Sequence, residues 1–147
     1  MTEVGAGLAI SPALRQALSD WLAGLRGLDD ASVHTIKAYN SDVAGFLHFL
    51  SLHHGGAAGM AQLRALTQTD LRAWMAQARA RGNAARSVAR ALSSLKSFAR
   101  WLAEREPGYD PSVILAARGP RFGRPLPRPL TESHARAVLD CVSDERE

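Results

Sequence analysis

Arginine and hydroxyl side chains gather along one side of a helix predicted at residues 85–102 (ARSVARALSSLKSFARWL). Short serines let a helix backbone come close to a surface, and arginine pairs with phosphate oxygens or with the acceptor edge of guanine. The polar side carries Arg86, Ser87, Arg90, Ser93, Ser94, Ser97 and Arg100, with Trp101 among them. This pattern favours a helix that lies against nucleic acid, and the alternative is a basic helix face that contacts only water.

The opposite side of the same helix is apolar and has the spacing of a buried face. Its members are Val88, Leu92, Leu95, Ala99 and Leu102, with Ala91 and Phe98 at the edges. We therefore expect Phe98 to be buried and Arg90 to be exposed. On that assignment, replacing Arg90 by Ala should leave the thermal stability nearly unchanged.

Positive charge is concentrated in the middle of the chain. Residues 64–128 hold 13 Lys or Arg against 4 acidic residues, whereas the remainder of the 147 residues holds 5 against 10. A net charge of about +9 over this stretch indicates a polyanionic partner, either nucleic acid or an anionic membrane. The membrane is the weaker alternative, because no apolar run approaches the ~20 residues that span a bilayer.

Composition limits the chemistry that the chain can support. Hydrophobic residues make up 46%, enough for a core, and the wealth of Ala and Leu favours helices. Cys141 is the single cysteine, so the sequence predicts neither a disulfide framework nor a cysteine metal site. His48, His53 and His54 do not stack on one helix face and have no acidic ligand nearby in sequence. We expect no metal, no cofactor, and a reducing, cytoplasmic setting.

Three further helices and their caps can be placed before residue 85. Ser11-Pro12 starts the first, which Gly24 and Gly27 close. The second runs from about Val33 to His53, capped by either Asp30 or Ser32, and residues 53–59 form a plain glycine-rich connector. The third starts at a Thr67–Asp70 capping box and ends near Gly82, and Asn83 caps the fourth helix, which includes residues 85–102 and continues to about Glu106.

The domain organisation follows from the changes in composition. Residues 1–10 are a flexible N-terminus, and residues 11–108 form the helical domain. Residues 109–130 are a basic linker rich in Pro and Arg, of which residues 119–129, if extended, cover ~30 Å. Residues 131–147 start a second domain. If the linker follows phosphates, it should become ordered on DNA; the alternative is a solvent-exposed tether.

Three segments together resemble the Xer-type tyrosine recombinases. SVHTIKAYNSDVAGFLHFL resembles their S..T..AY..D...F..FL helix, and ARSVARALSSLKSFARWL resembles their S..R.LS.L+SF.+.L helix. DPSVILAARGPRFGRPLPRPLT is similar to the passage that joins their N-terminal and catalytic domains, with Asp110 where Asn is common. The three segments occur in the family's order from Leu14 onward, and the connector at residues 53–62 is longer than in many members.

The resemblance implies an all-α, four-helix SAM-like core-binding domain, followed by a linker and the first helix of a truncated catalytic domain. Such a domain forms one jaw of a clamp around a double-stranded DNA half-site, and the full-length recombinases act as tetramers on DNA. By position, the implied DNA-binding residues are His34, Thr35, Lys37, Ser41, Arg86, Ser87, Arg90, Ser94, Lys96, Arg100, Arg118, Arg121, Arg124 and Arg128. Arg90 is the best candidate for base readout.

The family's chemistry uses a tyrosine nucleophile and charge-stabilising arginines, which the resemblance places beyond Glu147. Tyr39 and Tyr109 match no such position, so we expect no catalytic residue here. The implied function is DNA recombination, including chromosome dimer resolution, at the bacterial nucleoid. Two alternatives remain: a stand-alone DNA-binding module, and a helical interaction domain whose basic face docks an acidic protein.

Overall fold

The computed structural model describes residues 10–28 and 31–121, and these residues are helical without a β-strand. The expected all-α fold is confirmed. The helices are α2 (Pro12–Leu28), α3 (Val33–His54), α4 (Met60–Arg64), α5 (Gln68–Ala80), α6 (Ala85–Arg105) and α7 (Ser112–Ala116). No helix in the described part of the chain is both long and apolar enough to cross a membrane.

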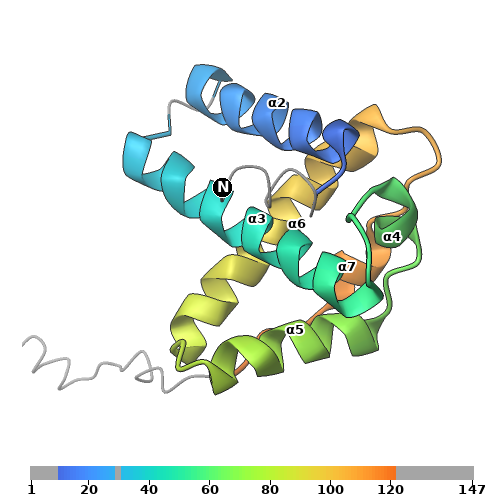
Figure 1. Ribbon diagram of the computed structural model, residues 1–147. Coiled ribbons are helices and arrows are strands. Elements are labelled where there is room, and N and C mark those ends of the chain that lie inside the picture. Colours follow the sequence, from blue (N-terminus) through green and yellow to red (C-terminus); the bar gives the residue numbers. More distant parts are fainter. Residues whose placement is uncertain (1–9, 29–30, 122–147) are drawn as a thin grey trace, which may run out of the picture.

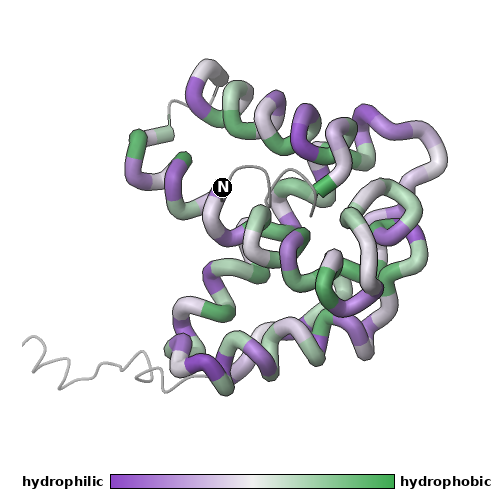
Figure 2. Tube along the Cα trace, viewed as in Figure 1, coloured by the Kyte–Doolittle hydropathy of each residue, from purple (hydrophilic) through white to green (hydrophobic). Residues whose placement is uncertain are grey.

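Helices α3 and α6 cross at the centre of the molecule and share the most extensive contact (Figure 1). Helix α2 covers one end of this pair and α5 covers the other, while α4 follows the C-terminal end of α3 and α7 packs against α5 and α6 (Figure 1). Apolar and polar residues alternate around the turns of each long helix, as amphipathic packing requires (Figure 2).

Aromatic side chains join the helices at two places in the core. Trp21 of α2 meets Phe98 of α6 edge to face, with ring centroids 5.2 Å apart. Phe46 of α3 meets Trp74 of α5 in the same manner at 5.0 Å. Edge-to-face rings gain electrostatic attraction beyond the burial of their area, so these two pairs fix α2 and α5 against the central helices.

Most of the expected helix caps are present. The hydroxyl of Ser11 accepts the Leu14 N–H, and Ser32, rather than Asp30, caps α3 by accepting the Thr35 N–H. In the capping box of α5, Thr67 Oγ1 accepts the Asp70 N–H while Asp70 Oδ2 accepts the Thr67 N–H. Because short polar side chains satisfy free N–H groups locally, sequence spacing was sufficient to place them.

Three local expectations were wrong. The residue at the N-cap position of α6 is Ala84, not Asn83, and it makes no side-chain cap. Gly24 and Gly27 lie inside α2, which continues to Leu28, because packing of the helix offsets the ~1 kcal/mol cost of a helical glycine. The short helix α4 was not expected, and its first turn is held by Gln62 Oε1, which accepts the Gly59 N–H at 2.8 Å.

The packed core extends beyond both ends of the segment 11–108. Ile10 is buried and pairs with Ala58 in an isolated bridge. Tyr109, Ile114 and Ala117 are also buried, so the first part of the segment assigned to the linker belongs to the core. The domain boundaries remain a prediction, and residues 1–9 and 122–147 lie outside the described residues.

We expect Phe98→Ala to lower the free energy of unfolding by about 3–5 kcal/mol, because the buried ring leaves a cavity between α2 and α6. Urea denaturation measures the loss. Leu52→Ala, at an exposed position, is the control and should cost little. Equal losses in the two variants would contradict this assignment of the core.

Candidate functional site

A hollow of about 370 Å³ lies where α3, α5 and α6 meet. It brings together three residues predicted to contact DNA, namely Ser41 from α3 and Ser87 and Arg90 from α6. Arg81 and Asn83, from the turn between α5 and α6, complete its polar wall and were not among the predicted residues. The positive charge of residues 64–128 was the only signal for Arg81, and Asn83 had none as a contact residue, because the position of both depends on how α5 packs against α6.

Asp42 is the buried centre of the polar network beside this hollow. Its Oδ1 accepts a hydrogen bond from Arg90 Nη2 at 2.7 Å, and its Oδ2 accepts one from Arg90 Nε at 3.2 Å. The Ser94 hydroxyl donates to Oδ2 at 2.8 Å. The Asp42 side chain is only 6% exposed, whereas the Arg90 side chain is 55% exposed. A bidentate carboxylate pair of this kind fixes the plane of a guanidinium group.

The network changes how two predicted contacts are understood. Ser94 is 2% exposed, and its hydroxyl donates a hydrogen bond to Asp42. In this arrangement Ser94 faces the protein interior rather than a partner. Arg90 uses the edge that carries Nε and Nη2 for Asp42, and its hydrogen bonds with Asp42 raise the pKa of Arg90 further above its ordinary value. The expectation that Arg90 is dispensable for stability overlooked this buried partner.

Most of the other predicted contact residues lie at the surface. The exposed ones are His34, Lys37, Ser41, Arg86, Arg100, Arg118 and Arg121. Thr35, Ser87 and Lys96 are partly buried, and the Thr35 hydroxyl oxygen accepts a hydrogen bond from Ser32 in the cap of α3. Arg124 and Arg128 lie outside the described residues.

The C-terminal half of α6 is partly covered by α2. Ser97 and Trp101 line a cleft shared with Trp21. Trp101 stacks on Phe98 with centroids 6.1 Å apart, and the Arg105 guanidinium lies 4.3 Å from its ring centroid. The apolar ring of Trp101 therefore packs within the protein, while Arg100 in the same half of α6 remains exposed.

A second group of arginines lies on the other side of α5. Arg72 and Arg79 of α5 and Arg118 after α7 line one shallow hollow with Pro120. The backbone at Gly119 runs close to Ala89 of α6. The segment around residues 118–120 is thus laid along α5 and α6, and its Arg118 joins Arg72 and Arg79 of α5 in one basic group.

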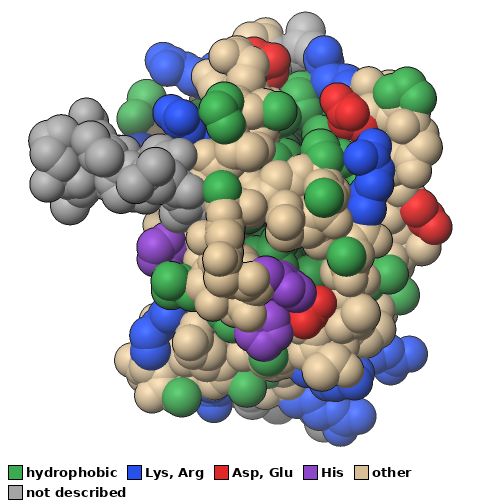
Figure 3. Space-filling view, turned by 45° about the vertical axis from the view of Figure 1, so that its right-hand side comes forward, with side chains coloured by type: hydrophobic (Ala, Val, Ile, Leu, Met, Phe, Trp, Pro, Cys, Tyr) green, Lys and Arg blue, Asp and Glu red, His purple; other side chains and the backbone are tan. Residues whose placement is uncertain are grey.

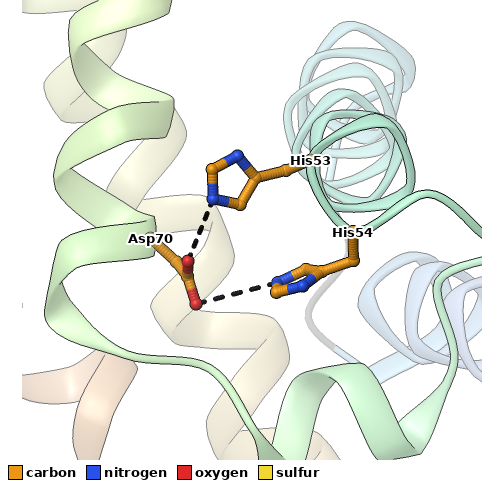
Figure 4. Close-up of side chains that lie close together, drawn as sticks. All are labelled: His53, His54 and Asp70. Atoms are coloured by element: carbon orange, nitrogen blue, oxygen red, sulfur yellow. Dashed lines mark hydrogen bonds and ion pairs between the residues drawn. The ribbon is translucent and has the colours of Figure 1, made fainter.

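His53, His54 and Asp70 form a cluster between the end of α3 and the start of α5 (Figure 4). His53 Nε2 lies 3.1 Å from Asp70 Oδ1, and His54 Nε2 lies 3.8 Å from Asp70 Oδ2. The sequence argument that these histidines have no acidic companion was wrong, because the fold brings Asp70 to them from 16 residues beyond His54. His48 is not part of the cluster.

The surroundings of Asp70 keep it ionised. Its buried position raises the pKa of the carboxyl, but hydrogen bonding with the backbone and side chain of Thr67 and the nearby His54 and His53 imidazoles outweigh this desolvation. The pKa of Asp70 is therefore lowered from its ordinary value.

Neither tyrosine is presented as a nucleophile. Tyr109 is buried, and this burial, with the charge of Asp110, raises the pKa of Tyr109 to about 12. Tyr39 is partly buried and stacks on Trp21 at 5.7 Å.

Comparison with known proteins agrees with the helical architecture. Residues 18–106 match the family model of the phage integrase N-terminal SAM-like domain. The chain belongs to this family. The matched SAM-like domain begins in α2 and ends at the last turn of α6, so it includes both helices whose side chains surround Asp42.

Curated relatives support the same assignment. The chain is 37% identical to the tyrosine recombinase XerC of Rhodospirillum centenum over 91% of its own length and 39% of the relative. It is 43% identical to the XerC of Methylobacterium nodulans over 87% of its length and 39% of the relative. The chain thus spans about two fifths of the relatives it matches, and the resemblance to Xer-type recombinases is confirmed. No solved structure gave a significant match.

We expect Arg90→Ala to lower the free energy of unfolding by about 1–3 kcal/mol, because it leaves the buried Asp42 carboxylate with Ser94 as its remaining hydrogen-bond donor. The loss stays below the 3–5 kcal/mol of a fully buried pair because Arg90 is half exposed. Arg100→Ala, an exposed arginine of the same helix, should change stability little. Equal stabilities of the two variants in urea would contradict a structural role for the pair.

We expect Asp70→Asn to lower the free energy of unfolding by about 1 kcal/mol near neutral pH, since it weakens the capping box of α5. A native pKa below the unfolded value of ~3.9 means that the ionised carboxylate stabilises the fold above that pH. This contribution disappears as pH falls through the native pKa, so the difference between wild type and variant should close in acid. Urea denaturation from pH 7 to pH ~2 measures it, and a difference independent of pH would contradict it.

Proposed function

We propose that this SAM-like domain binds double-stranded DNA as one jaw of the clamp of a tyrosine site-specific recombinase. The observation that carries the proposal is the exposed Arg90 guanidinium, held in a fixed plane by the buried Asp42 at the edge of a basic hollow. A purely solvated basic face needs no buried carboxylate to orient one of its arginines.

The geometry of the guanidinium supports base readout by Arg90. Asp42 accepts from Nε–H and from one N–H of Nη2, so the outer end of the guanidinium group, with an N–H of Nη1 and the second N–H of Nη2, remains for the O6 and N7 acceptors of guanine. In this proposal Asp42 is a positioning residue, while Ser41, Ser87, Arg81 and Asn83 around the hollow contact the sugar-phosphate backbone.

Phosphate contacts would supply most of the affinity. The exposed candidates on α3 are His34 and Lys37, and those on α6 are Arg86 and Arg100. Arg118 and Arg121 carry the basic surface onto the segment after α7. Ser94 is proposed to act through Asp42 rather than by touching DNA.

We infer further that the protein containing this domain cuts and rejoins DNA through a phosphotyrosyl intermediate, as a tetramer of recombinase subunits acting in chromosome dimer resolution. The names of the relatives, tyrosine recombinases, support the reaction class. In this proposal the nucleophile and its arginines belong to another domain, since Tyr109 is buried and Tyr39 stacks in the core.

Fluorescence anisotropy with a labelled random-sequence duplex tests DNA binding. The logarithm of the association constant should fall linearly with the logarithm of salt, with a slope of about −0.9 per neutralised phosphate. Replacing Arg118, Arg121, Arg124 and Arg128 together by Ser should reduce the slope by up to ~4 units if each contacts a phosphate. Arg15→Ala, an exposed arginine of α2, is the single-charge control.

Selection of preferred duplexes from the same pool tests base readout. Arg90→Lys keeps the charge but removes the paired donors of the guanidinium group. The variant should therefore retain most of the salt slope and lose the sequence preference. A flat salt response with binding retained would contradict the proposal. Displacement of the duplex by polyglutamate at equal charge would instead favour a domain that docks acidic proteins.

A further inference from the structure

The His53–His54–Asp70 cluster has the composition of a transition-metal site. Two imidazole nitrogens and one carboxylate are ligands that suit Zn²⁺ and its neighbours in the first transition row, whereas Mg²⁺ and Ca²⁺ prefer sites made of oxygen. In the space-filling view, histidine side chains lie beside an acidic side chain at the molecular surface (Figure 3). Such a position leaves room for water to complete the coordination.

The distances fit a tetrahedral ion after small side-chain rotations. Ligands about 2.0–2.1 Å from zinc lie about 3.3 Å from one another in a tetrahedron. His53 Nε2 and Asp70 Oδ1 are 3.1 Å apart, His54 Nε2 and Asp70 Oδ2 are 3.8 Å apart, and the ligand atoms all lie within 4.8 Å of one another. The two imidazoles are 40% and 36% exposed, so they can turn the remaining distance without disturbing the core.

Neighbouring groups also orient the side chains of the cluster, as they usually do for metal ligands in proteins. Asp70 is 11% exposed, and its Oδ2 accepts the Thr67 N–H at 3.0 Å. The His53 ring stacks on Phe49 with centroids 5.0 Å apart. One carboxylate and one imidazole are therefore oriented before any ion arrives, and the proton that His53 Nε2 donates to Asp70 Oδ1 is released when the ion binds (Figure 4).

We propose that His53, His54 and Asp70 bind one Zn²⁺ ion, with water completing the coordination, and that the ion ties the C-terminus of α3 to the N-terminus of α5. None of these three residues lines the hollow, whose nearest residue on α5 is Trp74, one turn or about 6 Å of helix after Asp70. The metal site is thus distinct from the proposed DNA surface and does not depend on it.

Isothermal titration of the full chain, without a polyhistidine tag, with zinc chloride tests the proposal. We expect one zinc per chain and a higher melting temperature as zinc increases, because the unfolded chain lacks the assembled site. Binding should weaken in acid, because protons compete with the ion for the imidazole nitrogens. NMR of the histidine rings should show shifts at His53 and His54.

His53→Gln with His54→Gln should weaken zinc binding by more than the roughly 10- to 100-fold that loss of an outer partner costs. His48→Gln, at an exposed histidine of α3 outside the cluster, is the matched control and should bind as wild type does. Cys141→Ser should also bind normally, which excludes the thiol as the source of the signal.

Two results would overturn the proposal. One is the absence of 1:1 binding up to about 100 μM zinc, where an assembled site would be measurably stabilised. The other is equal zinc binding by the double histidine variant and the wild type, which would mean that other surface residues bind the zinc. Unchanged DNA affinity in the double variant would leave the proposed function intact in either case.

Discussion

A carboxylate buried between two long helices constrains this domain more than any other single group. The Asp42 side chain is only 6% exposed, and a carboxylate in such a place must find hydrogen-bond donors. It finds them in Arg90 and Ser94, which α6 presents one turn apart. The requirement fixes the rotation and register of α6 against α3, and the aromatic pairs then attach α2 and α5 to that frame.

The same network joins stability to recognition. Arg90 cannot be assigned to the surface alone or to the core alone, because its inner edge satisfies Asp42 while its side chain remains half exposed. A guanidinium group held in this way loses less side-chain entropy when it meets a partner than a free one does. Sites built on helices with such support are more rigid than sites built on loops.

At the N-terminal end of α5, Asp70 both caps the helix and contacts the end of another helix. Asp70 closes the first turn of α5 and also faces two imidazoles from the end of α3. Capping needs only one carboxylate oxygen, which leaves the other for a partner. The helix cap thereby leaves one carboxylate oxygen of Asp70 available to the histidine side chains at the end of α3.

The sequence by itself determined the long helices and the family. Periodicity located the four long helices, short polar residues located most caps, and ordered motifs identified the SAM-like domain. Periodicity predicts the direction in which a side chain points around the helix axis, but it does not predict which residue of another helix that side chain contacts. Ser94 lies at the border of the two faces of α6, and only the approach of Asp42 decided that it points inward. Tertiary structure alone gave Arg90 its buried partner and brought Asp70 to the histidines, because both contacts join segments far apart in the chain.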